Sequence, residues 1–151
     1  LRESIESVKK YDAVVLNGDI SKNREIKEKL KKINYKLVIF ECCYETANLK
    51  DFDRKKKYVI LSGIGNNTNF SDLLNNNNFK IIKQFSFPDH HNFSNSEINS
   101  IIEFAKKNNS EIITTEKDFL RLDKDFQQKI KCLKVKIKMY NYDAFLKFLK
   151  K

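Results

Sequence analysis

The sequence has 151 residues, enough for one ordinary domain with its own core, or for one domain and a piece of another. Hydrophobic residues make up 40% of the chain and aromatic residues 12%, which excludes a disordered tail. A net charge of +10 favours a polyanionic partner without choosing between nucleic acid, an anionic membrane surface and a phosphorylated substrate. Genome composition explains so many lysines about as well.

No apolar run approaches the roughly 20 residues that a membrane-spanning helix needs. The three cysteines, Cys42, Cys43 and Cys132, show no metal-ligand spacing, and neighbours in a strand point to opposite faces. We therefore expect reduced cysteines, as in a cytosolic protein, and a soluble chain. The chain begins with Leu rather than Met, so we expect that it was cut from a longer protein.

The first third of the chain alternates strand and helix patterns. Residues 11–17, Tyr-Asp-Ala-Val-Val-Leu-Asn, form a short β-branched run that predicts a buried strand. Residues 22–33 carry apolar side chains at spacings of four and three, which predicts a helix with Ser21 as its cap. A second strand is predicted over residues 36–41.

Between residues 42 and 57 the periodicity disappears and charge accumulates, ending in Asp-Phe-Asp-Arg-Lys-Lys-Lys at 51–57. We place a boundary there. Residues 1–50 are then one part of the chain, and residues 51–151 form an α/β lobe.

The second part continues the alternation. Strands are predicted over residues 58–62, 79–87, 111–115 and 132–139. Helices are predicted after residue 66, after the capping-box pair Ser94 and Glu97, from residue 115, and over 141–151. Strand and helix alternate from start to finish, which predicts an α/β fold in which a three-layer, Rossmann-like lobe surrounds a mostly parallel sheet.

Both histidines and the single proline lie within residues 87–94, Phe-Pro-Asp-His-His-Asn-Phe-Ser, which we call the histidine loop. Pro88 fixes its own φ and favours an extended residue before it, so the run leaves a strand and cannot continue a helix. Asp89, His90 and His91 are therefore presented on a connection, and an Asp beside a His can orient its imidazole. A polar loop with solvated histidines is the alternative interpretation.

Three motifs directly follow predicted strands: Gly-Ile-Gly-Asn at 63–66, Asp-His-His at 89–91 and Thr-Glu-Lys-Asp at 115–118. Because ligands of parallel α/β sheets bind at the carboxyl ends of strands, we expect all three motifs at one edge. Backbone amides at a helix start after residue 66 can bind an anion, although a tight glycine turn explains Gly-x-Gly equally well.

Taken in order, three motifs resemble the C-terminal part of the tetraacyldisaccharide 4'-kinase family, the lipid A kinases of Gram-negative bacteria. They are Ser-Gly-Ile-Gly-Asn at 62–66 with a Phe following, the histidine loop, and Thr-Thr-Glu-Lys-Asp at 114–118. Leu-Arg-Glu at 1–3 and the strand at 12–17 are similar to the family's stretch just upstream, so the resemblance runs the length of the chain. The chain departs from the family at Phe93, which lacks the hydroxyl of the Tyr that is common there.

A larger departure concerns the P-loop. The family is similar to P-loop kinases, with a Gly-rich Walker A sequence ending in Gly-Lys-Thr, and no such sequence occurs here. The resemblance implies that the P-loop lobe, with its phosphate-binding lysine and catalytic carboxylates, lies upstream of Leu1. Residues 1–50 are then the tail of that lobe with a linker strand, and the 151-residue chain alone is expected to be inactive.

The resemblance implies transfer of the γ-phosphoryl group of ATP to the 4'-hydroxyl of tetraacyldisaccharide 1-phosphate. It implies ATP and Mg²⁺ as cofactors, an anionic membrane surface and the P-loop lobe as partners, no nucleic acid, and a peripheral place on the cytoplasmic face of the bacterial inner membrane.

The resemblance also assigns roles to residues. His90, partnered by Asp89, is a catalytic residue that meets an aspartate of the P-loop lobe. Arg2 supplies catalytic positive charge at the phosphates, and Glu3 helps to hold Mg²⁺. The remaining motif positions are Gly63, Gly65, Asn66, His91, Thr115, Glu116, Lys117 and Asp118. For the last four of these, a helix cap with local salt bridges is an equally good explanation.

Two other functions fit parts of the sequence. Asp89, His90 and His91 match the metal motif of a DHH-type phosphoesterase, but that chemistry needs further His ligands and the chain has none. A basic module that binds nucleic acid or an anionic surface without catalysis fits the charge. The lysines are dispersed, however, and no zinc-ligand or RNP-like pattern occurs.

Overall fold

The computed structural model describes residues 3–18, 20–21, 23–63 and 67–150. Its contacts divide the chain into two compact units, one formed by Leu1–Glu45 with Lys136–Lys151 and the other by Thr46–Val135. The first unit is therefore assembled from both ends of the chain, whereas the second is one continuous segment.

The first unit is a small sheet with helices. Its elements are the 3₁₀ helix η1 (Ile5–Lys10), the strands β1 (Ala13–Asn17), β2 (Val38–Thr46) and β7 (Val135–Met139), and the helices α1 (Arg24–Ile33) and α6 (Tyr142–Leu149). The strands lie in the order β1-β2-β7, and β1 and β2 are parallel. Leu30 of α1 is buried in one cluster with Val8 and Leu37, which confirms the apolar face predicted for this helix.

Three boundaries that were predicted from local sequence patterns differ from the boundaries in the structure. β2 continues to Thr46, because Tyr140 N donates to Glu41 O and Ala47 N donates to Lys134 O, which pairs this segment with β7. The strand predicted over 132–139 is two strands that join different sheets. Helix α1 begins at Arg24 with Asn23 as its N-cap, so the cap predicted at Ser21 was wrong.

The division into units also differs from the boundary expected near residue 51. The second unit begins at Thr46 and ends at Val135, and β7 and α6 belong to the first unit. The physical reason is the long-range pairing of β2 with β7, which no local pattern reveals. The assignment of residues 1–50 to a P-loop lobe stays a prediction.

The second unit is built around a parallel sheet. Its elements are η2 (Leu49–Asp51), β3 (Lys57–Ser62), α2 (Asn67–Asn76), β4 (Lys80–Ser86), α3 (Asn95–Lys107), β5 (Ser110–Thr115), α4 (Glu116–Phe119), α5 (Lys124–Gln127) and β6 (Ile130–Leu133). The strands lie in the order β4-β3-β5-β6, and every neighbouring pair is parallel. This arrangement confirms the predicted α/β fold.

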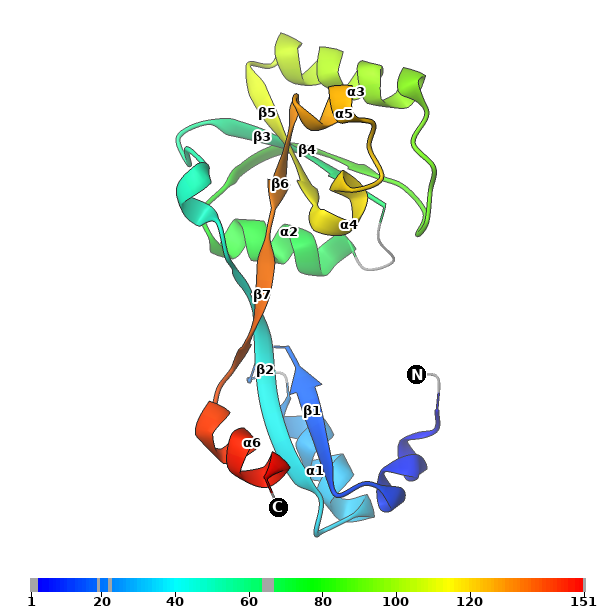
Figure 1. Ribbon diagram of the computed structural model, residues 1–151, viewed down its shortest axis with the longest axis vertical. Coiled ribbons are helices and arrows are strands. Elements are labelled where there is room, and N and C mark those ends of the chain that lie inside the picture. Colours follow the sequence, from blue (N-terminus) through cyan, green and yellow to red (C-terminus); the bar gives the residue numbers. More distant parts are fainter. Residues whose placement is uncertain (1–2, 19, 22, 64–66, 151) are drawn as a thin grey trace. The chain divides into compact units, whose positions relative to one another are not determined.

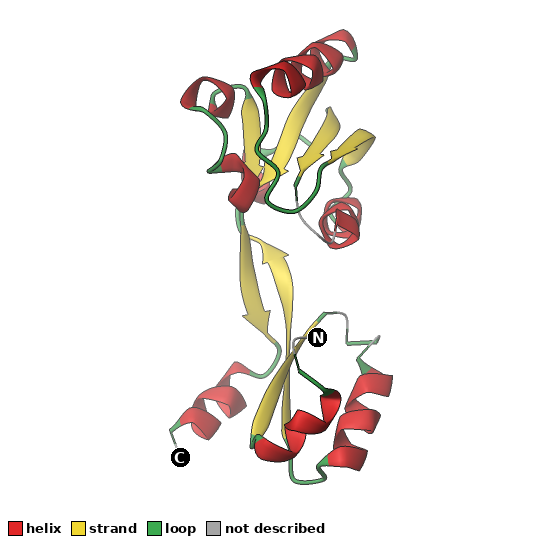
Figure 2. Ribbon diagram, turned by 90° about the vertical axis from the view of Figure 1, so that its right-hand side faces the viewer, coloured by secondary structure: helices red, strands yellow, loops and turns green. Residues whose placement is uncertain are grey.

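Helices cover both faces of this sheet, as Figures 1 and 2 show for α3 on one face and α2 on the other. Every residue of β3 after Lys57 is buried. Val59 and Leu61 belong to a core cluster with α3, and Tyr58 and Ile60 belong to a second cluster with α2. A strand covered on both faces needs a continuous apolar run rather than alternation, which is why its sequence was easy to recognise.

The order of the strands determines where a ligand can bind. From β3 the chain crosses to β4 at one side, and from β4 it returns past β3 to β5. The strand order therefore reverses between β3 and β5, and open α/β sheets bind ligands at the carboxyl ends of the strands at such a point. Gly63 follows β3 directly and α4 follows β5 directly, so both lie at this reversal.

We predict that Ile60→Ala in the 151-residue chain lowers the free energy of unfolding by about 2–5 kcal/mol, because it leaves a cavity beneath a central strand. Ile60 is fully buried, whereas Ile82 on the neighbouring strand β4 is 39% exposed. Ile82→Ala is therefore the matched control and should cost under about 1 kcal/mol. Urea denaturation followed by circular dichroism measures both, and equal losses would contradict the assigned core.

Candidate active site

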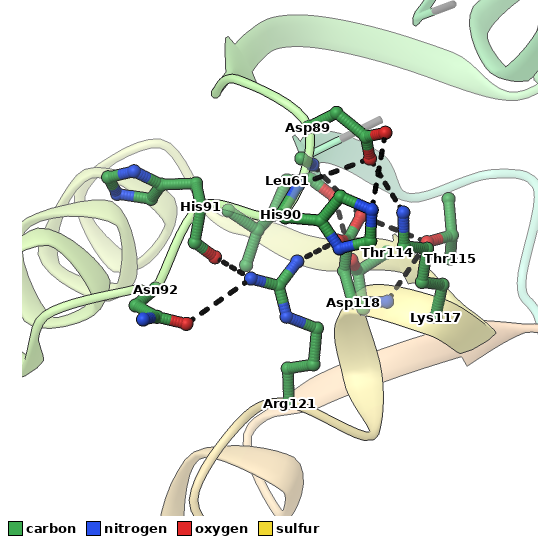
Figure 3. A network of polar contacts seen from close by, with 11 residues as sticks. Leu61, Asp89, His90, His91, Asn92, Thr114, Thr115, Lys117, Asp118 and Arg121 are labelled. Carbon is green, nitrogen blue, oxygen red and sulfur yellow. Dashed lines mark hydrogen bonds and ion pairs between the residues drawn. The ribbon is translucent and has the colours of Figure 1, made fainter. Parts of the chain in front are cut away.

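The structure brings together Gly63, the histidine loop and the start of α4 at the carboxyl edge of the parallel sheet (Figure 3). The expectation that these motifs share one edge is confirmed for the residues that the structure describes. Of the first motif only Gly63 is described, and Gly65 and Asn66 lie outside the described residues.

Asp118 is the buried centre of this edge, and its side chain is completely inaccessible. Its Oδ2 accepts hydrogen bonds from Gly63 N at 2.9 Å and from Thr115 Oγ1 at 2.9 Å. Its Oδ1 lies 3.7 Å from Nη1 of Arg121. A buried carboxylate needs such partners, because an isolated charge is strongly disfavoured away from water.

Thr115 begins helix α4 as its N-cap, and its Oγ1 accepts a hydrogen bond from Asp118 N at 3.2 Å. The helix cap and the local salt bridge that sequence analysis offered for residues 115–118 are therefore both present. Glycine suits position 63, since a Cβ there would lie 3.2 Å from Asp118 Oδ1 and 3.2 Å from the Phe93 ring, which is closer than an ordinary van der Waals contact.

Asp89, His90 and Lys117 form an exposed cluster beside this buried carboxylate. Lys117 Nζ donates to Asp89 Oδ1 at 2.6 Å, and His90 Nε2 lies 3.6 Å from Asp89 Oδ2. The hydrogen bond from Lys117 holds the pKa of the Asp89 carboxyl below its ordinary value, with a smaller contribution from His90 and opposition from partial burial. Asp89 is therefore a carboxylate at neutral pH, and the His90 side chain, 78% exposed, is free to meet another molecule.

His91 has different surroundings from His90. Its ring stacks on Phe87 with the centroids 4.7 Å apart, and its Nε2 lies 3.1 Å from both carboxylate oxygens of Glu97. Glu97 also completes the predicted capping box of α3 with Ser94. His91 thus joins the histidine loop to the helix that follows it.

Arg121 is the residue of this edge that sequence analysis missed. It follows α4, its Nη2 donates to the backbone carbonyl of His91, and its guanidinium carbon lies 5.7 Å from the centre of the Phe93 ring. Its spacing of three from Asp118, which suits a helical ion pair, was the available signal. Its contacts with the histidine loop are tertiary and left no trace in the local sequence.

The other predicted site residues are not part of this cluster. Glu116 is exposed, and its Oε2 accepts from Val135 N at 3.4 Å. Glu3 lies in the first unit, where its Oε2 accepts a hydrogen bond from Tyr11 Oη at 3.2 Å. Arg2 lies outside the described residues. Within the described ranges, no three His, Cys, Asp or Glu side chains gather as metal ligands, and no helix is long and apolar enough to cross a bilayer.

The sequence model of one protein family, tetraacyldisaccharide-1-P 4'-kinase (LpxK), matches residues 1–151. The chain belongs to this family. Among curated LpxK relatives, the tetraacyldisaccharide 4'-kinase of Pelagibacter ubique is 43% identical over 123 residues, which are 82% of this chain and 39% of that protein. The kinase of Rickettsia bellii is 37% identical over 91 residues, which are 60% of this chain and 28% of that protein.

A solved structure is also similar. It is a crystal structure of LpxK from Aquifex aeolicus, described as an "apo" form in complex with ATP, with a TM-score of 0.59 and 21% identity. The match covers 99% of this chain and 45% of that chain, and at this identity it supports the α/β fold alone. The chain thus spans less than half the length of these LpxK proteins.

We predict that Asp118→Asn lowers the free energy of unfolding by about 3 kcal/mol, because removing one partner of a buried ion pair leaves Arg121 uncompensated. Asp125→Asn on the exposed side of α5 is the matched control and should change it by under about 0.5 kcal/mol. Chemical denaturation of both variants tests this, and a loss below 1 kcal/mol for Asp118→Asn would show that the buried carboxylate is not stabilising.

A second prediction concerns Glu97. Hydrogen bonds from Ser94 N and Oγ, at 2.7 and 2.8 Å, and then from His91, hold the pKa of Glu97 below its ordinary value of 4.5. A carboxyl whose pKa is lower in the folded state stabilises the fold above the ordinary pKa, and this stabilisation disappears as pH falls through the folded-state pKa.

Glu97→Gln should therefore be less stable than the unsubstituted chain at pH 7, and the difference should narrow as the pH falls below 4.5. Thermal melting between pH 7 and pH 3 measures it. Glu103→Gln, at an exposed position of the same helix, is the control and should show no such convergence. A gap that persists unchanged at pH 3 would mean that the charge of Glu97 is not what stabilises the loop.

Proposed function

We propose that this chain is the C-terminal part of a tetraacyldisaccharide 4'-kinase, which transfers the γ-phosphoryl group of ATP to the 4'-hydroxyl of tetraacyldisaccharide 1-phosphate. The observation that carries the proposal is the match of the family model to all residues from 1 to 151. The exposed Asp89–His90 pair, which Lys117 of α4 holds beside the point where the strand order reverses, supports it, because an α/β sheet presents reacting groups there.

In this proposal a P-loop segment outside the chain binds the phosphates of ATP. The sequence has no Gly-rich run ending in Gly-Lys-Ser or Gly-Lys-Thr, and in P-loop enzymes that loop makes most of the β- and γ-phosphate contacts. The 151-residue chain alone then has no kinase turnover. Phosphoryl transfer depends mainly on positioning and charge stabilisation, so a site divided between two segments is chemically sufficient.

His90 acts as the catalytic group of this chain. Its exposed imidazole meets an aspartate of the P-loop segment, and the Asp89 carboxylate beside it, itself held by Lys117, orients the ring. The partial charge that develops on the attacking hydroxyl is then stabilised from both segments. His91, which is packed between Phe87 and Glu97, holds the loop and does not contact the substrate.

Arg2 and Glu3 have supporting roles in the proposal. Arg2 places positive charge near the phosphates. The described residues gather no set of three metal ligands and so do not fit a metal site of their own. Mg²⁺ in kinases is commonly held by one or two carboxylates together with substrate phosphates, and Glu3 supplies one such carboxylate. A bound Mg²⁺ would neutralise phosphate charge.

The remaining partners follow from the substrate. A tetraacylated disaccharide resides in a membrane, so we propose that the enzyme works at the cytoplasmic face of the bacterial inner membrane as a peripheral protein. The net charge of +10 suits an anionic surface. The proposed function involves no nucleic-acid partner.

A chimera tests this function. The chain replaces the matching part of the Pelagibacter ubique kinase, and transfer of ³²P from ATP to tetraacyldisaccharide 1-phosphate is measured. We expect turnover from the chimera and from the parent kinase, and none from the 151-residue chain or from the parent lacking that part. A folded chimera without turnover, beside an active parent, would reject the proposed function.

Within the chimera, His90→Ala should lower kcat about 10²- to 10⁴-fold and change KM much less, because a positioned acid-base group acts mainly in the transition state. His91→Ala is the matched control: its loss of ring stacking should lower thermal stability, with a much smaller effect on kcat in the fraction that is folded. Equal effects of the two substitutions on kcat would show that His90 has no special role.

A further inference from the structure

The short helix α4 and the residues after it reach every segment of the candidate site. Asp118 accepts a hydrogen bond from Gly63 N, directly after β3. Lys117 donates a hydrogen bond to the carboxylate of Asp89. Arg121 donates one to the backbone carbonyl of His91. Figure 3 shows Lys117 reaching Asp89 and Arg121 reaching His91 and Asn92 of the histidine loop. The loop is therefore held on both sides of His90, before it through the Asp89 carboxylate and after it through the backbone carbonyl of His91.

The contacts of Lys117 and Arg121 with the loop matter because of the backbone conformation of His90. Its φ is +62°, in the left-handed region, and the only other described non-glycine residues there are Asn78 and Asn109. Asparagine and histidine both occur in this region more often than most residues, but a non-glycine residue still needs surrounding contacts to stay there. The Lys117–Asp89 bond, with His90 N donating to Asp89 Oδ1 at 3.1 Å, fixes the residue before His90. Arg121 fixes the residue after it.

Arg121 is itself held on three sides. Its Nη1 lies 3.7 Å from Asp118 Oδ1, its Nη2 also lies 3.4 Å from Asn92 Oδ1, and its guanidinium faces the Phe93 ring. Its side chain is only 23% exposed. One planar guanidinium thus serves a carboxylate, a carbonyl and an aromatic face together, which a lysine ammonium cannot reproduce.

We propose that Lys117 and Arg121 are positioning residues that set the place and direction of His90 before the substrate arrives, an inference whose catalytic consequence rests on the proposed function. Neither needs to touch the substrate. Displacement of a reacting group by about 1 Å can cost on the order of 10²-fold in rate, so loss of either contact should reduce turnover without weakening substrate binding.

The kinetic test uses the chimera described above. Arg121→Lys, which keeps the charge and removes the planar fork, should lower kcat about 10- to 100-fold with KM changed less than threefold. Lys117→Met should act in the same direction. In the His90→Ala background both substitutions should have no further effect on kcat, because their contribution passes through His90. Losses that multiply in the double variants would mean that these residues act independently of His90.

A second measurement does not depend on kinase activity. In the 151-residue chain, the ¹H–¹⁵N nuclear Overhauser effect of the His90, His91 and Asn92 amides reports their mobility. Arg121→Lys should lower these values to those of flexible backbone while the amides of β3 and β5 keep theirs. Matched controls are Arg24→Lys, whose side chain is 85% exposed, and Lys124→Met at an exposed position of α5.

The kinetic and the NMR measurements test the kinase proposal and the positioning proposal separately. An inactive chimera combined with a mobile loop in Arg121→Lys would reject the kinase proposal and keep the positioning role of Arg121. A loop that stays rigid in Arg121→Lys would overturn the positioning role even if the chimera is active.

Discussion

The buried carboxylate of Asp118 is the constraint on which the candidate site depends. A charge without solvent needs several favourable partners, and Asp118 has hydrogen bonds from Gly63 N and Thr115 Oγ1 and the guanidinium of Arg121 3.7 Å away. Because Gly63 follows β3 whereas Thr115 and Arg121 flank α4, the buried charge links these two segments. The preference for glycine at 63 follows from the same crowding, since a Cβ there would lie 3.2 Å from Asp118 Oδ1.

In this site, the residues that support the loop are different from the residues that are exposed to another molecule. Asp118 is buried and its Oδ2 is hydrogen-bonded to Gly63 and Thr115 inside the protein, whereas the side chains of Asp89 and His90 are exposed to solvent. The parallel sheet supplies the base for both sets of residues, because β3 and β5 are neighbours whose carboxyl ends open at the same edge. A second segment of protein can therefore approach His90 without disturbing the charges that hold the loop.

The sequence predicted the parts of this molecule whose causes are local. The central strands were recognisable as continuous apolar runs, and the capping box of Ser94 and Glu97 marked the start of α3 correctly. Pairing between β2 and β7 was missed because its hydrogen bonds join residues from opposite ends of the chain. Arg121 was missed because its bond to the His91 carbonyl joins residues that lie 30 positions apart in the sequence. Asp118 was predicted as part of the Thr-Glu-Lys-Asp motif, but its complete burial depends on Gly63 and the strand before it, which only the folded chain brings near.

The first unit is built from both ends of the chain, and this has a consequence for synthesis on the ribosome. The second unit is continuous from Thr46 to Val135 and can fold as soon as it has emerged. β2 is made before it but has to wait for β7, which emerges after it. Until then one side of β2 lacks the strand that it pairs with in the finished sheet, and unpaired strands are sites of association between nascent chains. In β7, Lys136 and Lys138 alternate with apolar residues, and both lysines form ion pairs with Glu45. These ion pairs favour a single register for a strand that is synthesised after its partner.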